Sequence, residues 1–335
     1  MNEILFDKSQ GELTRVGYVY SNPLPKSEIS KVCTLQRKFK FFSEIAKSKS
    51  RQFKVMTIGT SFSERGVEGY NNYLAHATGR VLHYNRFLAS GGPVMRLMEM
   101  TNGDFFDSMS VDYVILESVE RYFIDGFEKI DLQSKTSFQD LVNQIKFDSK
   151  KRRQRVNSNE LKLKNGHRFF YDATIKAPMI NLLYNVYDKP WGAKTYKVPL
   201  VRNDLFSSGV KELLFTEEDI LALKKNNKPA RIKRANNILN KLSKKLQKKN
   251  IELIVLVCPD KYDLYYPYIE GRHRYEKPVF FQLLNELKKD YQYVNSKKVL
   301  SASLEKDKNV YYYDDAHWSP VGAKIIAEEL EKVIK

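Results

Sequence analysis

The feature that most constrains the fold is an apolar stretch of strand length, residues 53–58, which runs directly into the turn sequence GTSFS at residues 59–63. A serine on a sharp turn after a buried strand stands clear of the sheet, where its hydroxyl can act as a nucleophile. The helix after such a turn can offer backbone N–H groups to a developing oxyanion. Ser61 is therefore a candidate nucleophile. The alternative is that Ser61 only caps a helix in an ordinary strand-to-helix turn, so the chain must also supply a base and an acid.

Strand-like and helix-like segments alternate along much of the chain. This rhythm predicts an α/β fold with a central parallel sheet and helices on both faces. The expected strands cover residues 53–58, 80–84, 111–116, 251–257 and 291–295, and the expected helices cover residues 29–46, 68–78, 94–100, 278–289 and a closing segment to residue 334. We expect an N-terminal extension over residues 1–50 and one main domain over residues 51–335, with residues 130–216 as a large insertion.

The net charge of +17 indicates an anionic partner. Much of this excess lies in residues 222–250, which contain eleven Lys or Arg and no Asp or Glu. The segment has apolar residues spaced by three and four positions, as on one face of a helix: Ile232, Ala235, Leu239, Leu242 and Leu246. Its basic face could meet an acidic polymer or an anionic membrane surface, or it could be a solvated helix face. No recognition motif for a nucleic acid is present in the sequence.

Cysteine usage and hydropathy give little support to a metal site, a disulfide framework or a membrane-spanning segment. Cys33 and Cys258 lie far apart in the sequence and give neither a metal-ligand spacing nor a disulfide framework. No His, Cys, Asp and Glu cluster has the spacing of metal ligands, so we expect no metal and no other cofactor. The N-terminus has no apolar signal-peptide core, and no run of about 18 apolar residues occurs. We expect a soluble chain, which is compatible with an ectodomain that lacks its anchor.

His317 is the best candidate for the base. It follows Asp314 and Asp315 in the sequence DDAHWSP, and Ser319 and Pro320 are typical of the first residues of a helix. A carboxylate two or three residues before a histidine can accept the Nδ1–H bond and stabilise the imidazolium, which leaves Nε2 free to face a serine. The alternative is a surface loop with an unrelated aspartate and histidine.

Four short blocks resemble the SGNH hydrolase superfamily, and more closely its polysaccharide O-acetyltransferase branch, which includes the alginate acetylation proteins and the PatB-type enzymes of cell-wall polymers. The blocks are GTSFS at residues 59–63, VILE with ER within residues 114–121, PDKY at residues 259–262 and DAHWS at residues 315–319. The order of serine, aspartate and histidine agrees with the PatB-type enzymes, whereas in the alginate proteins the Asp-His block precedes the serine. The resemblance implies a three-layer α/β/α fold.

By this resemblance, Ser61 is the nucleophile that becomes acetylated, His317 is the general base and an aspartate orients the histidine. Classical members of the superfamily use the third residue before the histidine, here Asp314. The Asp-x-His-Trp pattern of the acetyltransferase branch gives Asp315 instead. Because Trp318 also matches this pattern, we favour Asp315 and keep Asp314 as the alternative.

The superfamily block that supplies an asparagine after the third strand is absent, since residues 117–120 read ESVE. The oxyanion hole is then expected to consist of the backbone N–H groups of Ser61 and of Gly91 or Gly92, because two glycines at a strand-to-helix turn let the backbone approach a ligand closely. The substrate-binding candidates are Glu117, Arg121, Lys261 and Trp318.

The resemblance predicts an O-acetyltransferase that moves an acetyl group through an acetyl-serine to hydroxyls of a cell-surface or secondary cell-wall polysaccharide. The alternatives are a carbohydrate acetylesterase with the same triad and a non-catalytic module that binds an acidic polymer. The resemblance also implies an extracytoplasmic, membrane-associated protein whose acetyl donor is a membrane-embedded acyltransferase partner.

Overall fold

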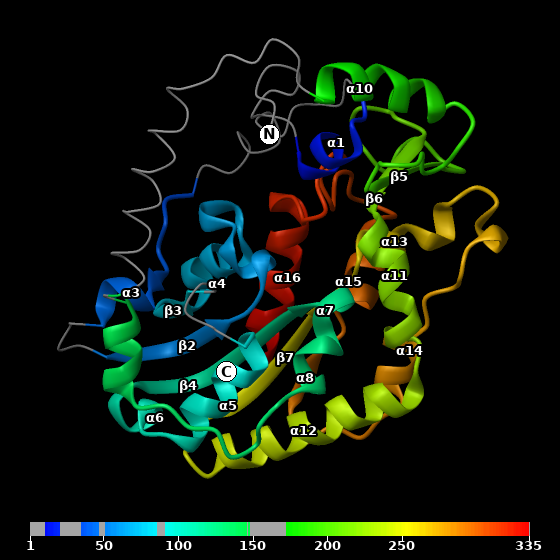
Figure 1. Ribbon diagram of the computed structural model, residues 1–335. Helices are drawn as coiled ribbons and strands as arrows, with labels where there is room; N and C mark the ends of the chain where they lie inside the picture. The colour runs from blue at the N-terminus through cyan, green and yellow to red at the C-terminus, as the bar shows by residue number, and fades with distance from the viewer. Residues whose placement is uncertain are drawn as a thin grey trace.

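The structure, a computed structural model, describes residues 11–20, 35–46, 51–85, 91–145, 147 and 172–334. Its centre is a six-stranded sheet in which every neighbouring pair of strands is parallel, in the order β1-β3-β2-β4-β7-β8 (Figure 1). The strands are β1 Lys40–Phe41, β2 Gln52–Ile58, β3 Val81–Tyr84, β4 Ser110–Val119, β7 Glu252–Cys258 and β8 Gln292–Val294. The predicted α/β fold with a central parallel sheet is confirmed.

Helices cover both faces of the sheet, so that the domain has three layers (Figure 1). The α-helices are α1 Glu12–Gly17, α3 Phe42–Ile45, α4 Tyr70–Thr78, α5 Pro93–Asn102, α6 Phe105–Ser108, α7 Glu120–Phe123, α8 Asp125–Glu128, α10 Asp172–Leu183, α11 Glu217–Asn226, α12 Pro229–Gln247, α13 Lys261–Tyr265, α14 Phe280–Asn285, α15 Ser296–Ser303 and α16 Pro320–Val333. Short 3-10 helices are η1 Ser61–Glu64, η2 Gly66–Glu68, η4 Tyr266–Tyr268 and η5 Arg272–Arg274.

The continuous apolar sequence of β7 explains why it lies inside the sheet with both faces covered. Successive side chains of a strand point to opposite faces. One set, Leu253, Val255 and Val257, packs in the core with α5 and α12, and the other, Ile254, Leu256 and Cys258, packs in the core with α4 and α16. The strand therefore joins two hydrophobic cores, one on each side of the sheet.

Two strands within or next to the predicted insertion pack against a core of the main domain. Strands β5 Thr195–Pro199 and β6 Glu212–Thr216 form an antiparallel pair. Leu213, Leu214 and Phe215 of β6 are buried in the same core as α16. Residues 146 and 148–171 of the predicted insertion lie outside the described residues.

The expected helix over residues 29–46 is wrong in the part that the structure describes. Residues 35–39 are not helical, β1 pairs in parallel with β3, and only α3 is helical in this segment. The cause is the aromatic sequence FKFF at residues 39–42. Phe39 is buried in the core on one side of the sheet and Phe42 in the core on the other side, so the two side chains do not share one helical face.

The basic segment forms two helices, α11 and α12, instead of one. Lys228 has an extended backbone because it precedes Pro229, and this interrupts the helix. The apolar residues predicted for one face of α12 are all buried. Among the described residues, no helix combines the length and the apolar character needed to cross a membrane.

Candidate active site

Ser61 lies at the carboxyl end of β2, on the first residue of the 3-10 turn η1, and is half-buried. Strand β2 is in the middle of the sheet, between β3 and β4, so the serine stands at a central position of the sheet edge. The turn is tight: a Cβ on Gly59 would lie 2.4 Å from Glu117 Oε2 and 2.5 Å from Ser63 Oγ. Glycine is therefore required directly before the Thr60–Ser61 step.

His317 and Asp315 approach Ser61 from the loop before α16. His317 Nε2 lies 2.7 Å from Ser61 Oγ, and His317 Nδ1 lies 2.6 Å from Asp315 Oδ1. The same Asp315 oxygen accepts the backbone N–H of His317 at 3.1 Å. Both His317 and Asp315 are buried, and the three side chains form a connected chain of hydrogen bonds of which Ser61 and His317 line the cavity.

Asp314 faces the other way. Its carboxylate accepts the backbone N–H of Gly11, and its carbonyl accepts the N–H of Leu13 at 2.9 Å. Burial raises the pKa of Asp314, while the bond from Gly11 lowers it. Of the two candidate aspartates, the structure joins Asp315 to His317, and Asp314 holds the segment that carries α1.

Glu117 lies beneath the turn that carries Ser61. It is fully buried and accepts hydrogen bonds from Thr60 N–H at 2.7 Å, from Thr60 Oγ1 at 2.6 Å, and from the N–H and Oγ of Ser63 at 3.2 and 2.8 Å. Ser63 Oγ is in turn 2.8 Å from the hydroxyl of Tyr70. One carboxylate thus forms hydrogen bonds with residues on both sides of Ser61, which fixes the conformation of the turn.

Lys261 stabilises the loop that carries Asp315 and His317. Its buried ammonium donates to the carbonyl oxygens of Tyr312 at 2.7 Å, Tyr313 at 2.5 Å and Asp315 at 3.3 Å. Burial lowers the pKa of Lys261 to about 7, against the opposing effect of Asp314 and Asp315. The loop that carries Asp315 and His317 is therefore built around a buried lysine.

Arg121 anchors the wall beside the triad. Its Nη1 donates to Asp260 at 2.8 Å and to Asp219 at 3.1 Å. Burial raises the pKa of Asp219 to about 6, although Arg121 lowers it, and burial likewise raises the pKa of Asp260. These pairs connect α7, α11 and the start of α13, which fixes three elements around one guanidinium.

Ser61 and His317 open into a cavity of about 280 Å³. Side chains from five parts of the chain line it: Glu12, Leu13 and Val16 of α1; Ser61; Arg121 and Tyr122; Lys194, Thr216 and Glu218; and Ala316 and His317. The wall formed by α1 comes from the predicted N-terminal extension, and no motif in residues 11–17 signals this role.

The family model of the SGNH hydrolase-like domain of acetyltransferase AlgX matches residues 208–335. This part of the chain is similar to that domain. No curated protein and no solved structure matches the chain. The matched range contains Lys261, Asp315 and His317 but begins after Ser61, so the serine is joined to the SGNH-like part by the geometry described above.

Three of the four residues expected to bind substrate have other roles in the SGNH-like fold. Glu117 and Lys261 are fully buried, with their polar atoms directed to the turn and to the loop. Trp318 is buried against Phe62, and its Nε1 donates to the hydroxyl of Tyr311 at 2.7 Å. These three residues support the turn and the loop of the site but do not line the cavity. Of the four candidates, Arg121 lines it.

The two glycines proposed for the oxyanion hole precede α5. Gly91 and Gly92 have φ values of 83° and 90°, in the region that favours glycine, and neither lines the cavity of Ser61. Residues 86–90, which lead to them, lie outside the described residues. The Ser61 N–H, at the start of η1, is the donor that the described geometry places at the nucleophile.

A cluster of possible metal ligands coincides with the triad in the described part of the chain. Glu12, Asp315 and His317 each place one ligand atom within 4.8 Å of the others. However, the two ring nitrogens of His317 already contact Asp315 and Ser61. A metal would have to displace one of these partners, so the set fits a histidine–carboxylate hydrogen-bond system better than a metal centre.

Proposed function

We propose that the protein is an O-acetyltransferase that carries an acetyl group on Ser61 and passes it to hydroxyls of a cell-surface or secondary cell-wall polysaccharide. The observation that carries this proposal is the hydrogen-bonded chain from Ser61 Oγ through His317 to Asp315. The match to the SGNH-like domain of an acetyltransferase family supports the same chemistry.

In the first half-reaction, Ser61 Oγ attacks the carbonyl carbon of an acetyl ester while His317 Nε2 accepts the serine proton. Asp315 accepts the Nδ1–H bond, which fixes the tautomer and stabilises the imidazolium. The tetrahedral intermediate collapses with loss of the donor's alkoxide, which takes the proton from His317. The product is an acetyl ester on Ser61 and a free donor alcohol.

In the second half-reaction, an acceptor hydroxyl attacks the acetyl-serine. His317 Nε2 accepts the acceptor's proton and returns it to Ser61 Oγ as the serine leaves. The Ser61 N–H stabilises the oxyanion in both steps, and loss of one such donor typically costs about 3 kcal/mol of transition-state stabilisation. An oxyanion hole with few hydrogen-bond donors suits a substrate whose acetyl group is already activated.

A carbohydrate acetylesterase with the same triad is the second candidate, with water as the acceptor. The two activities differ in how well the occupied cavity excludes water. Transfer is favoured by the cover that α1 gives to the cavity through Leu13 and Val16, two apolar side chains beside Ser61. We also propose that the acceptor polymer lies outside the cytoplasm and that a membrane-embedded acyltransferase supplies the acetyl groups.

The test is to trap the acetyl-enzyme with p-nitrophenyl acetate and to locate the acetyl group by mass spectrometry. We expect acetylation at Ser61, its loss in Ser61→Ala, and a rate lowered by roughly 10³-fold or more in His317→Ala. Oligosaccharide acceptors then separate transfer from hydrolysis. An acetyl group on another residue, at the same rate in Ser61→Ala, would contradict the proposal.

The aspartate pair gives a matched control for this test. Asp315→Asn should lower the acetylation rate by roughly 10³- to 10⁴-fold, because the amide favours the wrong imidazole tautomer. Asp314→Asn, a neighbouring change of the same kind, should have a much smaller effect because Asp314 faces Gly11. The reverse order would assign the triad acid to Asp314.

A further inference from the structure

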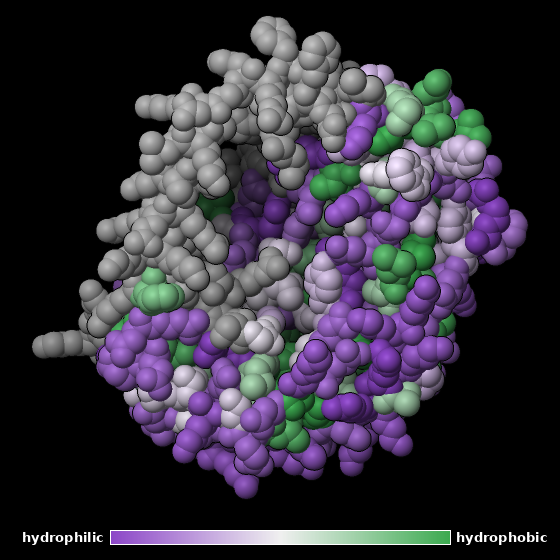
Figure 2. Space-filling model, viewed as in Figure 1, coloured by the Kyte–Doolittle hydropathy of each residue, from purple (hydrophilic) through white to green (hydrophobic). Residues whose placement is uncertain are grey.

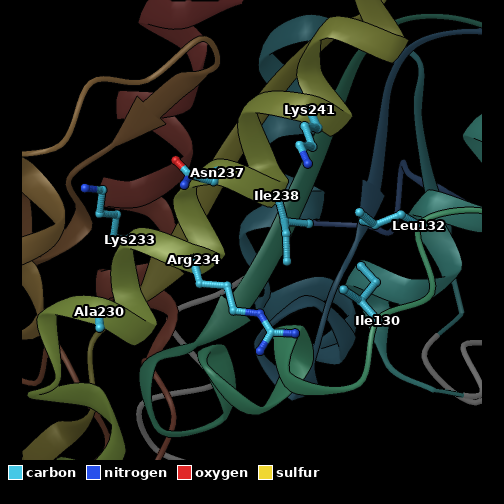
Figure 3. Close-up of a pocket in the computed structure, with 8 residues that line it drawn as sticks. All are labelled: Ile130, Leu132, Ala230, Lys233, Arg234, Asn237, Ile238 and Lys241. Carbon is cyan, nitrogen blue, oxygen red and sulfur yellow. The ribbon is translucent and has the colours of Figure 1, made fainter.

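A second depression, of about 450 Å³, lies along α12 and shares no lining residue with the cavity of Ser61. Its wall is one face of α12, with Lys233, Arg234 and Lys241 among the residues, and its far side is formed by Ile130 and Leu132 (Figure 3). We call this depression the α12 groove. In Figure 1, α12 runs along the lower edge of the molecule, away from α1 and the β5–β6 pair.

Several other cations of this basic segment pair with carboxylates. Arg231 pairs with Glu128 at 2.8 Å, Lys244 with Asp290 at 3.0 Å and Lys249 with Asp107 at 2.7 Å. Each of these pairs links α12, or the residues just after it, to a carboxylate from a neighbouring element. The positive charge of the segment is therefore partly cancelled outside the groove.

The three cations of the α12 groove line one depression together. Lys233, Arg234 and Lys241 are exposed, and within the described residues none of them pairs with a carboxylate. Arg234 makes one contact, to the backbone carbonyl of Glu128 at 3.4 Å. Asn237 is also exposed in the groove and adds an amide donor and acceptor. An uncancelled positive charge is thus concentrated in one hollow.

The shape of this surface fits a polymer strand better than a membrane. The apolar face of α12 is buried in the protein core, so it cannot enter a bilayer. Within the described residues, no large exposed hydrophobic side chain lies on α12, and Figure 2 shows mainly hydrophilic residues along this lower edge. A flat lipid surface would contact a flat or protruding face of the protein, whereas these cations line a depression.

We propose that the α12 groove binds a strand of acidic polysaccharide, with Lys233, Arg234 and Lys241 contacting its anionic groups and Asn237 contacting its hydroxyls. Lys233 and Lys241 are eight residues apart, about 12 Å along the helix axis, so they reach more than one sugar unit. The apolar side chains of Ile130, Leu132 and Ile238 in the groove can pack against the less polar faces of sugar rings. This site goes beyond the proposed catalysis, because it holds a polymer at a place where no chemistry occurs.

The experiment compares two triple variants that remove the same charge. The groove variant is Lys233→Gln with Arg234→Gln and Lys241→Gln, and the control is Arg231→Gln with Lys244→Gln and Lys249→Gln. Binding of each folded protein to polygalacturonate, neutral dextran and phosphatidylglycerol vesicles is measured at several salt concentrations, and thermal unfolding checks the fold.

We expect salt-dependent binding of the wild-type protein to polygalacturonate and none to dextran. The groove variant should bind polygalacturonate roughly tenfold or more weakly, because each cation that faces a polyanion releases counterions, and the control should bind nearly as the wild type does. Equal losses in the two variants, no wild-type binding, or a groove-dependent preference for vesicles would each overturn the proposal. Ser61→Ala should bind as the wild type does, which separates this site from the proposed acetyl transfer.

Discussion

At the scale of single residues, the site uses two carboxylates for different tasks. Asp315 contacts the imidazole of His317, whereas Glu117 contacts the turn that carries Ser61 and the thiol of Cys258. Four donors of the turn and, at 3.4 Å, the thiol of Cys258 converge on Glu117. The carboxylate can accept them because it has acceptor positions on both oxygens. We therefore expect Glu117 to act as a positioning residue for Ser61, the proposed nucleophile.

Replacing Glu117 by Gln should separate positioning from chemistry. The amide places two donors against the donors of Thr60 and Ser63, so the turn must move. We expect kcat for a small acetyl ester to fall by roughly 10- to 100-fold with little change in KM, by analogy with other residues that orient reactive groups. The free energy of unfolding should fall by about 2 kcal/mol or more, because buried hydrogen bonds to a charged group are lost.

Steady-state kinetics and urea unfolding measure these two effects. The exposed pair of Glu128 with Arg231 provides the control, since Glu128→Gln removes the same charge at the surface and should change neither quantity by much. An unchanged kcat in Glu117→Gln would show that the turn keeps its geometry without this carboxylate.

At the scale of elements, α1 is held against the catalytic loop by backbone contacts. Gly11 and Leu13 bond to Asp314, and Thr195 Oγ1 donates to the carbonyl of Leu13 at 2.8 Å. A Cβ on Gly11 would lie 2.1 Å from the carbonyl oxygen of Asp314, which leaves no room for any other side chain. The close approach of Gly11 therefore sets the position of α1 over the cavity.

Gly11→Ala should displace α1 and open the cavity. We expect a loss of about 1 to 3 kcal/mol of stability from overpacking, and a lower ratio of transfer to hydrolysis because water reaches the acetyl-serine more easily. The control is Gly126→Ala, whose Cβ would meet Val94 at an ordinary contact of 3.4 Å. Product analysis with an oligosaccharide acceptor gives the ratio, and an unchanged ratio in Gly11→Ala would mean that α1 does not exclude water.

The elements also show which parts of the site a sequence can reveal. Ser61 and His317 could be predicted because each lies in a short motif, and the parallel sheet brings the ends of its strands to one edge. Glu117 could be placed near the site because β4 neighbours β2, but its direction depends on packing around Gly59 and Ser63. The role of α1 could not be predicted, since its contact with Asp314 spans 303 positions and depends on the missing side chain of Gly11.

At the scale of the whole molecule, the proposed active site and the proposed binding groove lie apart from each other. The cavity of Ser61 lies by α1 and the β5–β6 pair, and the α12 groove lies along the opposite edge in Figure 1. Buried charges stabilise the first region, whereas exposed and unpaired cations characterise the second. Charge in this protein thus has a structural role at the site and a proposed binding role on α12.

Lys261 links the buried charge to the stability of the whole fold. Its pKa is lowered by burial from its ordinary value of 10.5 to about 7 in the folded protein. Between these two values the unfolded chain binds a proton that the folded chain does not, so stability rises with pH in this window. Below about pH 7 both states are protonated, and the full penalty of burying the ammonium remains.

Lys261→Met removes this titration, although it also removes the bonds to the loop carbonyls. The difference in unfolding free energy between wild type and Lys261→Met should therefore shift in favour of the wild type by roughly 3 kcal/mol from about pH 6.5 to about pH 9.5. Urea unfolding at several pH values measures it. Lys324→Met, an exposed change on α16, should leave the pH profile unaltered. A difference that is constant over this range would show that Lys261 stays protonated when buried, held by the carbonyls of Tyr312 and Tyr313.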